Sequence, residues 1–224
     1  TIILLWITTL ALCIGCSNND NELPAIKPGS TGTLTDNDGI EYIWVRYGDL
    51  DWMASNYNAG TPYYEQKNSR GQALLRNSDT ELVKAYYTTY GNLYTYEEAV
   101  ANAPAGWRLP TDEDWKKLET ELYMDGDELG LLEQWRGKQA GMLLKEEGTG
   151  FRILYGGTRA YGTFAYGTPY MNKDMNAYFW SSSKIVQSDS VQTGIIRAAS
   201  KVYEGILRGT SNLTAAYSVR CIKE

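Results

Sequence analysis

Two short helices are predicted in the middle of the chain by polar capping residues followed by apolar positions. Thr95 stands three residues before Glu98, a spacing typical of a capping box, and the helix it opens should reach about Ala103. Pro104 ends that helix because proline has no amide proton to donate. Thr111 repeats the N-cap pattern, and apolar residues then recur at helical spacing to about residue 123. One face of this second helix should be buried.

A third helix is predicted over residues 128–144, although glycines interrupt its pattern. Shorter runs of β-branched and aromatic residues, separated by Gly, Ser and Asn, predict strands. These runs lie at residues 40–45, 151–155, 177–180, 194–197 and 217–222. Because the helices come first and short strands dominate later, the predicted fold class is α+β, with two or three helices packed against short antiparallel strands.

The N-terminal segment differs from the rest of the chain. Ile2–Ile14 is mostly apolar and uncharged, but it is shorter than the roughly 20 residues that span a bilayer. It is typical of the apolar region of a secretory signal, and its end resembles the lipobox of bacterial lipoproteins. That resemblance implies cleavage before Cys16, acylation of Cys16 and attachment to the membrane by the lipid. We expect residues 1–15 to be the later part of such a signal; an ordinary signal peptide or a buried strand is the alternative.

Residues 16–34 are polar, contain two prolines and show no hydrophobic periodicity, so they are predicted to form a flexible tether. Acidic residues just after Cys16 resemble the surface-export signal of Bacteroidetes-type lipoproteins. The expected location is therefore the outer membrane, with the domain exposed at the cell surface. No internal repeat or second linker follows, and residues 35–224 are predicted to form one domain.

Composition excludes several kinds of chemistry. The 224 residues include no histidine, which removes Ser-His-Asp and Cys-His nucleophiles and HExxH zinc sites. The formal net charge of −6 makes nucleic acid a poor candidate partner. The segment 36–39 begins like a calcium loop but lacks the later ligands, so it is predicted to be a turn. We expect neither a metal ion nor a cofactor.

Several segments, in this order, match motifs of one known family. They are Asp36–Tyr42, Trp52–Asn56, Tyr90–Tyr94, Gly106–Trp115, Tyr178–Ser183 and Ser218–Ile222. Over residues 35–224 the chain thus resembles the Fibrobacter succinogenes major paralogous domain, a family associated with bacterial surface lipoproteins. The resemblance implies a C-type-lectin-like fold. The residues that carry this structural signature are Trp52, Gly106, Trp107, Pro110, Trp115, Trp180, Arg220 and Cys221.

Physical roles can be given to several of these signature residues. Gly106 permits an unusual backbone angle, and Pro110 stiffens the entry to the helix after Thr111. Trp107 and Trp115 are expected to be core residues, with ligand stacking as the alternative. Many family members have a cysteine before the proline of the central block that could pair with the cysteine near the end. Ala103 occupies that position here, so Cys221 is expected to be unpaired and buried.

The segment 148–178 combines tyrosines with glycines and asparagines, a mixture that evolved binding surfaces use. The candidate ligand-binding residues are Tyr161, Tyr166, Tyr170, Asn172 and Asn176. The alternative is that half of the tyrosines are sheet core. The function expected is a non-catalytic, lipid-anchored surface module for binding or adhesion, recognising a glycan or a protein.

Other functions remain open at this point. One is a structural or assembly component of the envelope or a pilus. Another is a variable protein of a diversity-generating retroelement, with residues 178–217 as the variable segment. Catalysis is not expected, because the acidic clusters, such as residues 112–114, suit helix first turns. The central block is also similar to formylglycine-generating enzymes, but their active-site cysteines have no counterpart here.

Overall fold

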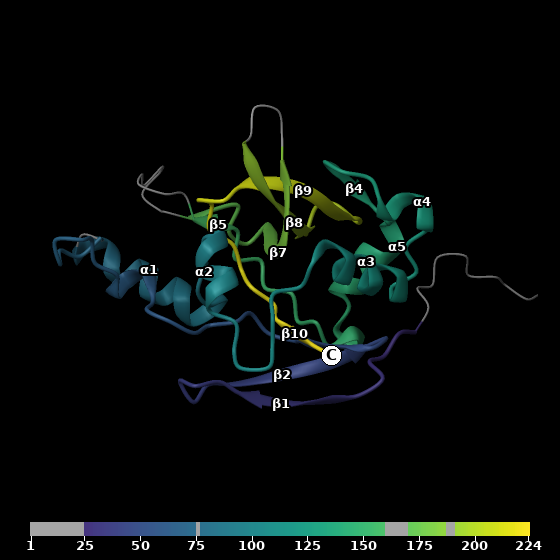
Figure 1. The fold of residues 1–224 in the computed structure, drawn as a ribbon, viewed down its shortest axis with the longest axis horizontal. Helices are drawn as coiled ribbons and strands as arrows, with labels where there is room; N and C mark the ends of the chain where they lie inside the picture. Colours follow the sequence, from purple (N-terminus) through teal and green to yellow (C-terminus); the bar gives the residue numbers. More distant parts are fainter. Residues whose placement is uncertain (1–24, 75–76, 160–169, 187–190) are drawn as a thin grey trace, which may run out of the picture.

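The fold is an α+β arrangement of two antiparallel sheets with helices around them (Figure 1). The computed structural model describes residues 25–74, 77–159, 170–186 and 191–224, without the side chains of residues 77–79. The helices are α1 (Asn77–Tyr90), α2 (Tyr96–Ala101), α3 (Asp112–Glu121), α4 (Gly126–Leu129) and α5 (Lys138–Lys145), with the 3₁₀ turns η1 (Tyr63–Glu65) and η2 (Glu147–Thr149). The strands are β1 (Thr31–Thr35), β2 (Glu41–Tyr47), β3 (Leu50–Met53), β4 (Gln134–Arg136), β5 (Thr158–Arg159), β6 (Tyr170–Met171), β7 (Asn176–Val186), β8 (Gln192–Ser200), β9 (Ile206–Asn212) and β10 (Ile222–Lys223).

The two larger sheets lie at opposite ends of the view in Figure 1. One has the order β1-β2-β3-β10 and the other β4-β9-β8-β7, while β5 and β6 form a separate pair. All of these strand pairs are antiparallel, which confirms the predicted fold class. The last residues of the chain link the sheets, because Ser218 bridges to Phe179 in β7 and Ile222 pairs with Trp52 in β3.

The two predicted capping boxes are confirmed. The Thr95 amide donates to Glu98 Oε2 at 2.8 Å, and the Glu98 amide returns a bond to Thr95 Oγ1, so α2 begins as expected. Thr111 and Asp114 make the same reciprocal pair at the start of α3. The turn at residues 36–39 is also as predicted, because Asp36 Oδ1 accepts the amides of Asp38 and Ile40.

Two predicted elements are wrong. Residues 128–144 do not form one helix, because β4 pairs with β9 in the middle of the segment and Gly137 takes a left-handed φ of 59°. The chain therefore divides into α4, β4 and α5. Residues 151–155 form no strand, and Arg152 has a positive φ of 49° that breaks an extended run. The predicted strand at 217–222 shrinks to isolated bridges and β10.

The central core forms where α3 lies between the sheets. The rings of Trp52 and Trp115 have centroids 4.9 Å apart, and Phe151 and Phe179 extend this aromatic cluster. Trp180 is also fully buried, and its indole nitrogen donates to the Tyr94 carbonyl at 2.8 Å. Trp107 differs from expectation, because it is only partly buried, against the hydrophobic cluster that contains Trp180. Gly106 has the predicted unusual backbone, with φ of 77°.

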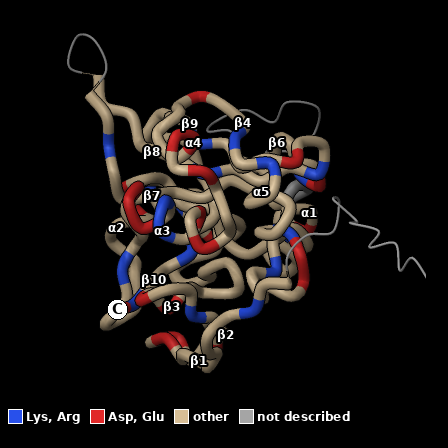
Figure 2. Tube along the Cα trace, turned by 90° about the vertical axis from the view of Figure 1, so that its right-hand side faces the viewer, with Lys and Arg blue, Asp and Glu red and all other residues tan. Residues whose placement is uncertain are grey.

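A buried network of charges joins α3 to the second sheet. Glu119 accepts hydrogen bonds from Arg197 at 2.6 Å and from Arg136 at 3.0 Å. Asp112 lies about two turns before Glu119 on the same helix. It pairs with Arg197 at 2.8 Å and with Arg208 at 2.6 Å. The three arginines come from β8, β4 and β9, so two acids of one helix hold three neighbouring strands. Figure 2 shows the acidic and basic positions around α3.

Asp112 is ionised because of this network. Burial by itself would raise the pKa of its carboxyl, but the hydrogen bonds from Arg208 and the charge of Arg197 outweigh burial and lower the pKa to about 2. Removing one partner from such a buried set leaves an uncompensated charge, which is strongly destabilising.

Arg220 holds the other side of the core without any acid. Its guanidinium donates to Asn56 Oδ1 and to the carbonyls of Met53, Phe151 and Arg152. Cys221 beside it is fully buried and free, as predicted. Pro110, also in the signature, accepts the Ser182 amide on its carbonyl at 2.8 Å, which ties the entry of α3 to β7. The signature residues of the sequence are thus mainly structural.

The Asp112 carboxylate makes stability depend on pH in a defined window. Its pKa is lower in the folded chain than the ordinary value near 4, so its contribution is present above about pH 4 and is lost as pH falls toward 2. We predict that Asp112→Asn removes about 2 kcal/mol of this pH-dependent stability in denaturant titrations. Asp38→Asn at an exposed acid is the control; equal pH profiles for the two variants would contradict the assignment.

Cys221 should be inert in the folded chain. Burial raises the pKa of its thiol to about 12, and the thiolate is the reactive form. Every described element lies in residues 25–224, where Cys221 is the single cysteine. A fragment of these residues is predicted to react with an alkylating reagent only after denaturant unfolds it. Rapid labelling of the native fragment would show that the thiol is accessible.

Candidate functional site

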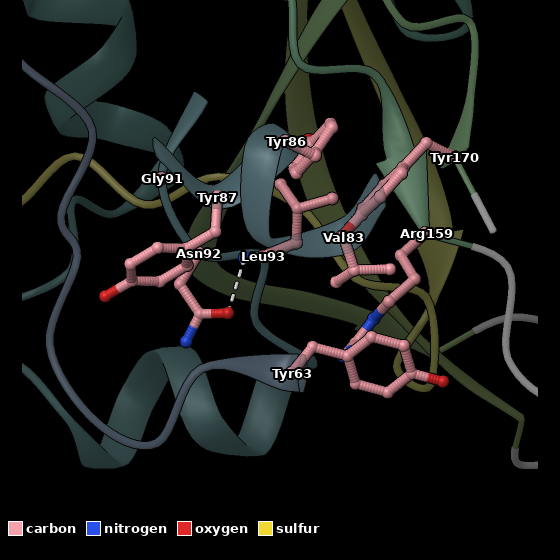
Figure 3. A pocket seen from close by; sticks show the side chains of 9 residues that line it. All are labelled: Tyr63, Val83, Tyr86, Tyr87, Gly91, Asn92, Leu93, Arg159 and Tyr170. Carbon is pink, nitrogen blue, oxygen red and sulfur yellow. Dashed lines mark hydrogen bonds between the residues drawn. The ribbon is translucent and has the colours of Figure 1, made fainter. Parts of the chain in front are cut away.

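A small pocket lies where η1, α1 and the β5–β6 pair meet (Figure 3). Four of its nine lining residues are tyrosines, and one arginine enters from β5. Its lining residues are Tyr63, Val83, Tyr86, Tyr87, Gly91, Asn92, Leu93, Arg159 and Tyr170. The cavity is about 10 Å³, which is about the room that one water-sized atom requires.

Two stacked tyrosines form the inner wall of this pocket. Tyr86 of α1 and Tyr170 of β6 lie nearly parallel, with an interplanar angle of 6°, and both are buried. The Tyr86 hydroxyl donates to the Gly156 carbonyl at 2.7 Å, which fixes α1 against the segment before β5. Burial raises the pKa of both phenols, so they remain neutral hydrogen-bonding groups at physiological pH.

Arg159 is the charged group of the pocket. It is 6% exposed, and its guanidinium carbon lies 3.8 Å from the centre of the Tyr63 ring. Among the described residues its Nη1 has no hydrogen-bond partner. Burial lowers the pKa of this guanidinium, and the acid that acts on it electrostatically, Glu98, is held instead by Thr95.

The outer rim of the pocket consists of half-buried rings. Tyr63 and Tyr87 line it, and the neighbouring Tyr64 meets Tyr87 edge to face with centroids 5.5 Å apart. The Tyr87 hydroxyl donates to the Asn58 carbonyl at 3.2 Å, so this ring is held in place. Exposed faces of fixed aromatic rings suit stacking on a ligand with little loss of conformational entropy.

The structure separates the predicted ligand-binding residues. Tyr161 and Tyr166 lie outside the described residues. Tyr170 is not an exposed contact residue but a buried part of the pocket wall, as the core alternative allowed. Asn172 and Asn176 both donate side-chain hydrogen bonds to the Tyr178 hydroxyl, at 3.1 and 2.9 Å. These two amides therefore shape the turn before β7.

Sequence reasoning missed the part of the pocket that comes from α1. A signal for this helix exists, because apolar or aromatic residues recur at helical spacing at positions 83, 86, 87 and 90. No comparable signal marks Arg159, because its burial depends on contacts with residues about 70 to 100 positions earlier.

Three acids at the starts of α2 and α3 have structural partners. Asp112 belongs to the buried network, and Asp114 binds both Arg108 and the Thr111 cap. Glu98 completes the cap of α2. Within the described ranges, no group of three or more Asp, Glu or Cys side chains is placed to hold a metal ion.

Comparison with known proteins places the chain in a family. The model of the Fibrobacter succinogenes major domain matches residues 45–223, which is most of the chain. The chain belongs to this family. The matched part runs from within β2 to β10, so it contains the sheet β4-β9-β8-β7 and the whole pocket but not β1.

Further comparisons add no relatives. No curated protein and no solved structure matches the chain. The C-type-lectin-like arrangement implied by the family resemblance therefore stays a prediction beyond the α+β class. Of the helices in the described part of this Fibrobacter succinogenes major domain, none is long and apolar enough to cross a bilayer.

The Tyr86 hydroxyl is predicted to stabilise the pocket. Tyr86→Phe removes the donor to the buried Gly156 carbonyl and should lower the free energy of unfolding by about 1 to 2 kcal/mol. Tyr87→Phe is the matched control, because its hydroxyl is only partly buried, and should change stability by about 0.5 kcal/mol or less. Urea unfolding measures both; similar losses for the two variants would count against the assignment.

Proposed function

We propose that this protein is a non-catalytic, lipid-anchored binding module of the bacterial cell surface. The observation that carries the binding role is the rigid aromatic pocket, with half-buried Tyr63 and Tyr87 at its rim and Arg159 within it. Ordered tyrosines present contact area with a polar tip, and their faces also stack on sugar rings. A glycan or a protein at the surface is the ligand class that fits.

The anchoring part of the proposal rests on the sequence. Ile2–Ile14 followed by Gly15-Cys16 is typical of a lipoprotein signal, and the polar residues 16–34 would act as the tether. An outer-membrane location with the domain facing outward follows from the same segment. Membership in the Fibrobacter succinogenes major domain family is compatible with this arrangement.

The non-catalytic part is supported by how the acids are used. Asp112, Asp114 and Glu98 are occupied by arginine pairs or helix caps, and the chain has no histidine. A general acid–base pair needs titratable groups free to face a substrate. In the pocket, burial raises the pKa of Tyr86 and Tyr170, so their hydroxyls keep their protons at physiological pH. These tyrosines and Arg159 therefore suit binding better than proton transfer.

A structural or pilus-assembly role is the second candidate. It is favoured by β1, which lies at the edge of its sheet and has no strand on its outer side among the described residues. An open edge can accept a strand of another chain. Purification of the chain with stoichiometric envelope partners would support this role over ligand binding.

The retroelement hypothesis remains a lesser alternative. Most of β8, in the middle of the segment 178–217, is buried, so diversified positions would have to avoid its inward-facing residues. A reverse transcriptase gene with a near-copy of this coding segment beside the gene would support it. A gene neighbourhood without these features would remove it.

The binding proposal makes a prediction for the rim tyrosines. Residues 25–224, tested on glycan arrays and in cell-surface pulldowns, should retain a defined ligand. Tyr63→Ala should weaken that binding at least about fivefold, because stacking contributes about 1 kcal/mol or more per aromatic contact. Tyr203→Ala, at an exposed ring between β8 and β9, is the control.

Two outcomes of this experiment are decisive. Loss of binding in the Tyr63 variant with retention in the Tyr203 variant supports the pocket as the site. Equal binding by both variants moves the site elsewhere, and no signal above background on arrays or cells rejects the binding role.

A further inference from the structure

Arg159 differs from the other buried arginines that the structure describes. Arg136, Arg197 and Arg208 each bind a carboxylate, and Arg220 donates to four oxygen atoms. Arg159 has no ion pair or hydrogen bond from its guanidinium within the described residues, and its Nη1 is fully enclosed. In the part of the chain that the structure describes, the structural arginines are thus paired and the guanidinium of Arg159 is not.

An enclosed guanidinium without an anionic partner is unfavourable. Removing a charge from water costs several kcal/mol unless another group compensates it. The guanidinium of Arg159 stacks on the Tyr63 ring, with its central carbon 3.8 Å from the ring centre. This contact offsets part of the cost of burying the charge, because the face of an aromatic ring carries partial negative charge. It leaves the in-plane N–H donors unused, and those are the donors that bind carboxylates.

The cavity beside Arg159 restricts what can enter. A volume of about 10 Å³ admits one oxygen-sized atom but not a whole sugar ring or a tetrahedral phosphate. A planar carboxylate can place one oxygen there while the rest of its molecule stays outside. The half-buried rings of Tyr63 and Tyr87 line the same pocket and offer a sugar ring a surface for stacking.

We propose that the Arg159 pocket binds the carboxylate of an acidic sugar, with the sugar ring against the rim tyrosines. The inference rests on the proposed surface-binding function and names its ligand class. Glu98 does not compete for the guanidinium, since its carboxylate accepts from the Thr95 amide at 2.8 Å and the Thr95 hydroxyl at 2.9 Å. An acidic sugar is favoured over an acidic peptide because the rim is aromatic and fixed.

The test measures binding of the full chain to galacturonate, glucuronate and sialyl oligosaccharides by calorimetry. Each oligosaccharide is compared with its methyl ester, which keeps the sugar and removes the charge. At least one acidic oligosaccharide should bind, and its ester should bind at least about tenfold more weakly, as expected for a lost charged hydrogen bond. This comparison needs no variant and stands even if a substitution prevents folding.

Two arginine variants complete the experiment. Arg159→Met should lower affinity for the acidic oligosaccharide at least about tenfold while the ester is unaffected. Arg152→Met makes the same charge change at an exposed position and should leave affinity unchanged. Because the guanidinium of Arg159 has no carboxylate partner among the described residues, its loss should also leave the thermal midpoint equal or higher.

Several results would overturn the inference. Equal binding of acid and ester, or unchanged affinity in Arg159→Met, would show that Arg159 does not bind the carboxylate of the sugar. Tighter binding of poly-glutamate than of every acidic sugar would assign the site to a peptide. If no acidic sugar binds but Tyr63-dependent binding of a neutral glycan persists, this inference fails and the surface-binding function stands; if neither occurs, both fail.

Discussion

The fold depends on the buried ion network between α3 and the second sheet. Asp112 and Glu119, about two turns apart on one helix, receive arginines from β4, β8 and β9. Arg197 and Arg208 are direct partners in the β8–β9 register, so a shift of either strand would separate them from the acids. The network thus fixes strand register as well as helix position, and each charge is expensive to leave alone.

Arg159 lies outside this network, and its environment has a different character. Aromatic rings surround it, from η1, α1 and β6, and those elements are tied down by bonds such as that from Tyr86 to the Gly156 carbonyl. The core and the ion network make the fold rigid, while the Nη1 donor of Arg159 has no partner among the residues that the structure describes. Trp52, Trp115 and Thr193 also bury a polar atom without a partner there, but Arg159 is the charged residue among these four. An unpaired buried charge is far less favourable than an unpaired neutral donor.

Local chemistry explains which elements could be predicted from sequence. The capping boxes at Thr95 and Thr111 each join residues three positions apart, and both are present in the structure. The burial of the Cys221 thiol and the positive φ of Gly106 could also be predicted from the residue type. The third helix failed because pairing of β4 with the distant β9 outweighed local propensity. The site was the least predictable part, since Arg159 and Tyr63 come together only through tertiary packing.

The central claim is that Arg159, which has no anionic partner within the described ranges, binds a ligand, while the other buried arginines hold the fold. Side-chain NMR of the arginine Nε–H groups tests this most directly, because each buried guanidinium gives its own signal. On addition of an acidic oligosaccharide that binds, the Arg159 signal should shift with saturation, while those of Arg136, Arg197, Arg208 and Arg220 should not move. The claim would be contradicted if the signals of Arg136, Arg197 or Arg208 shifted, or if the Arg159 signal did not change when the ligand is added.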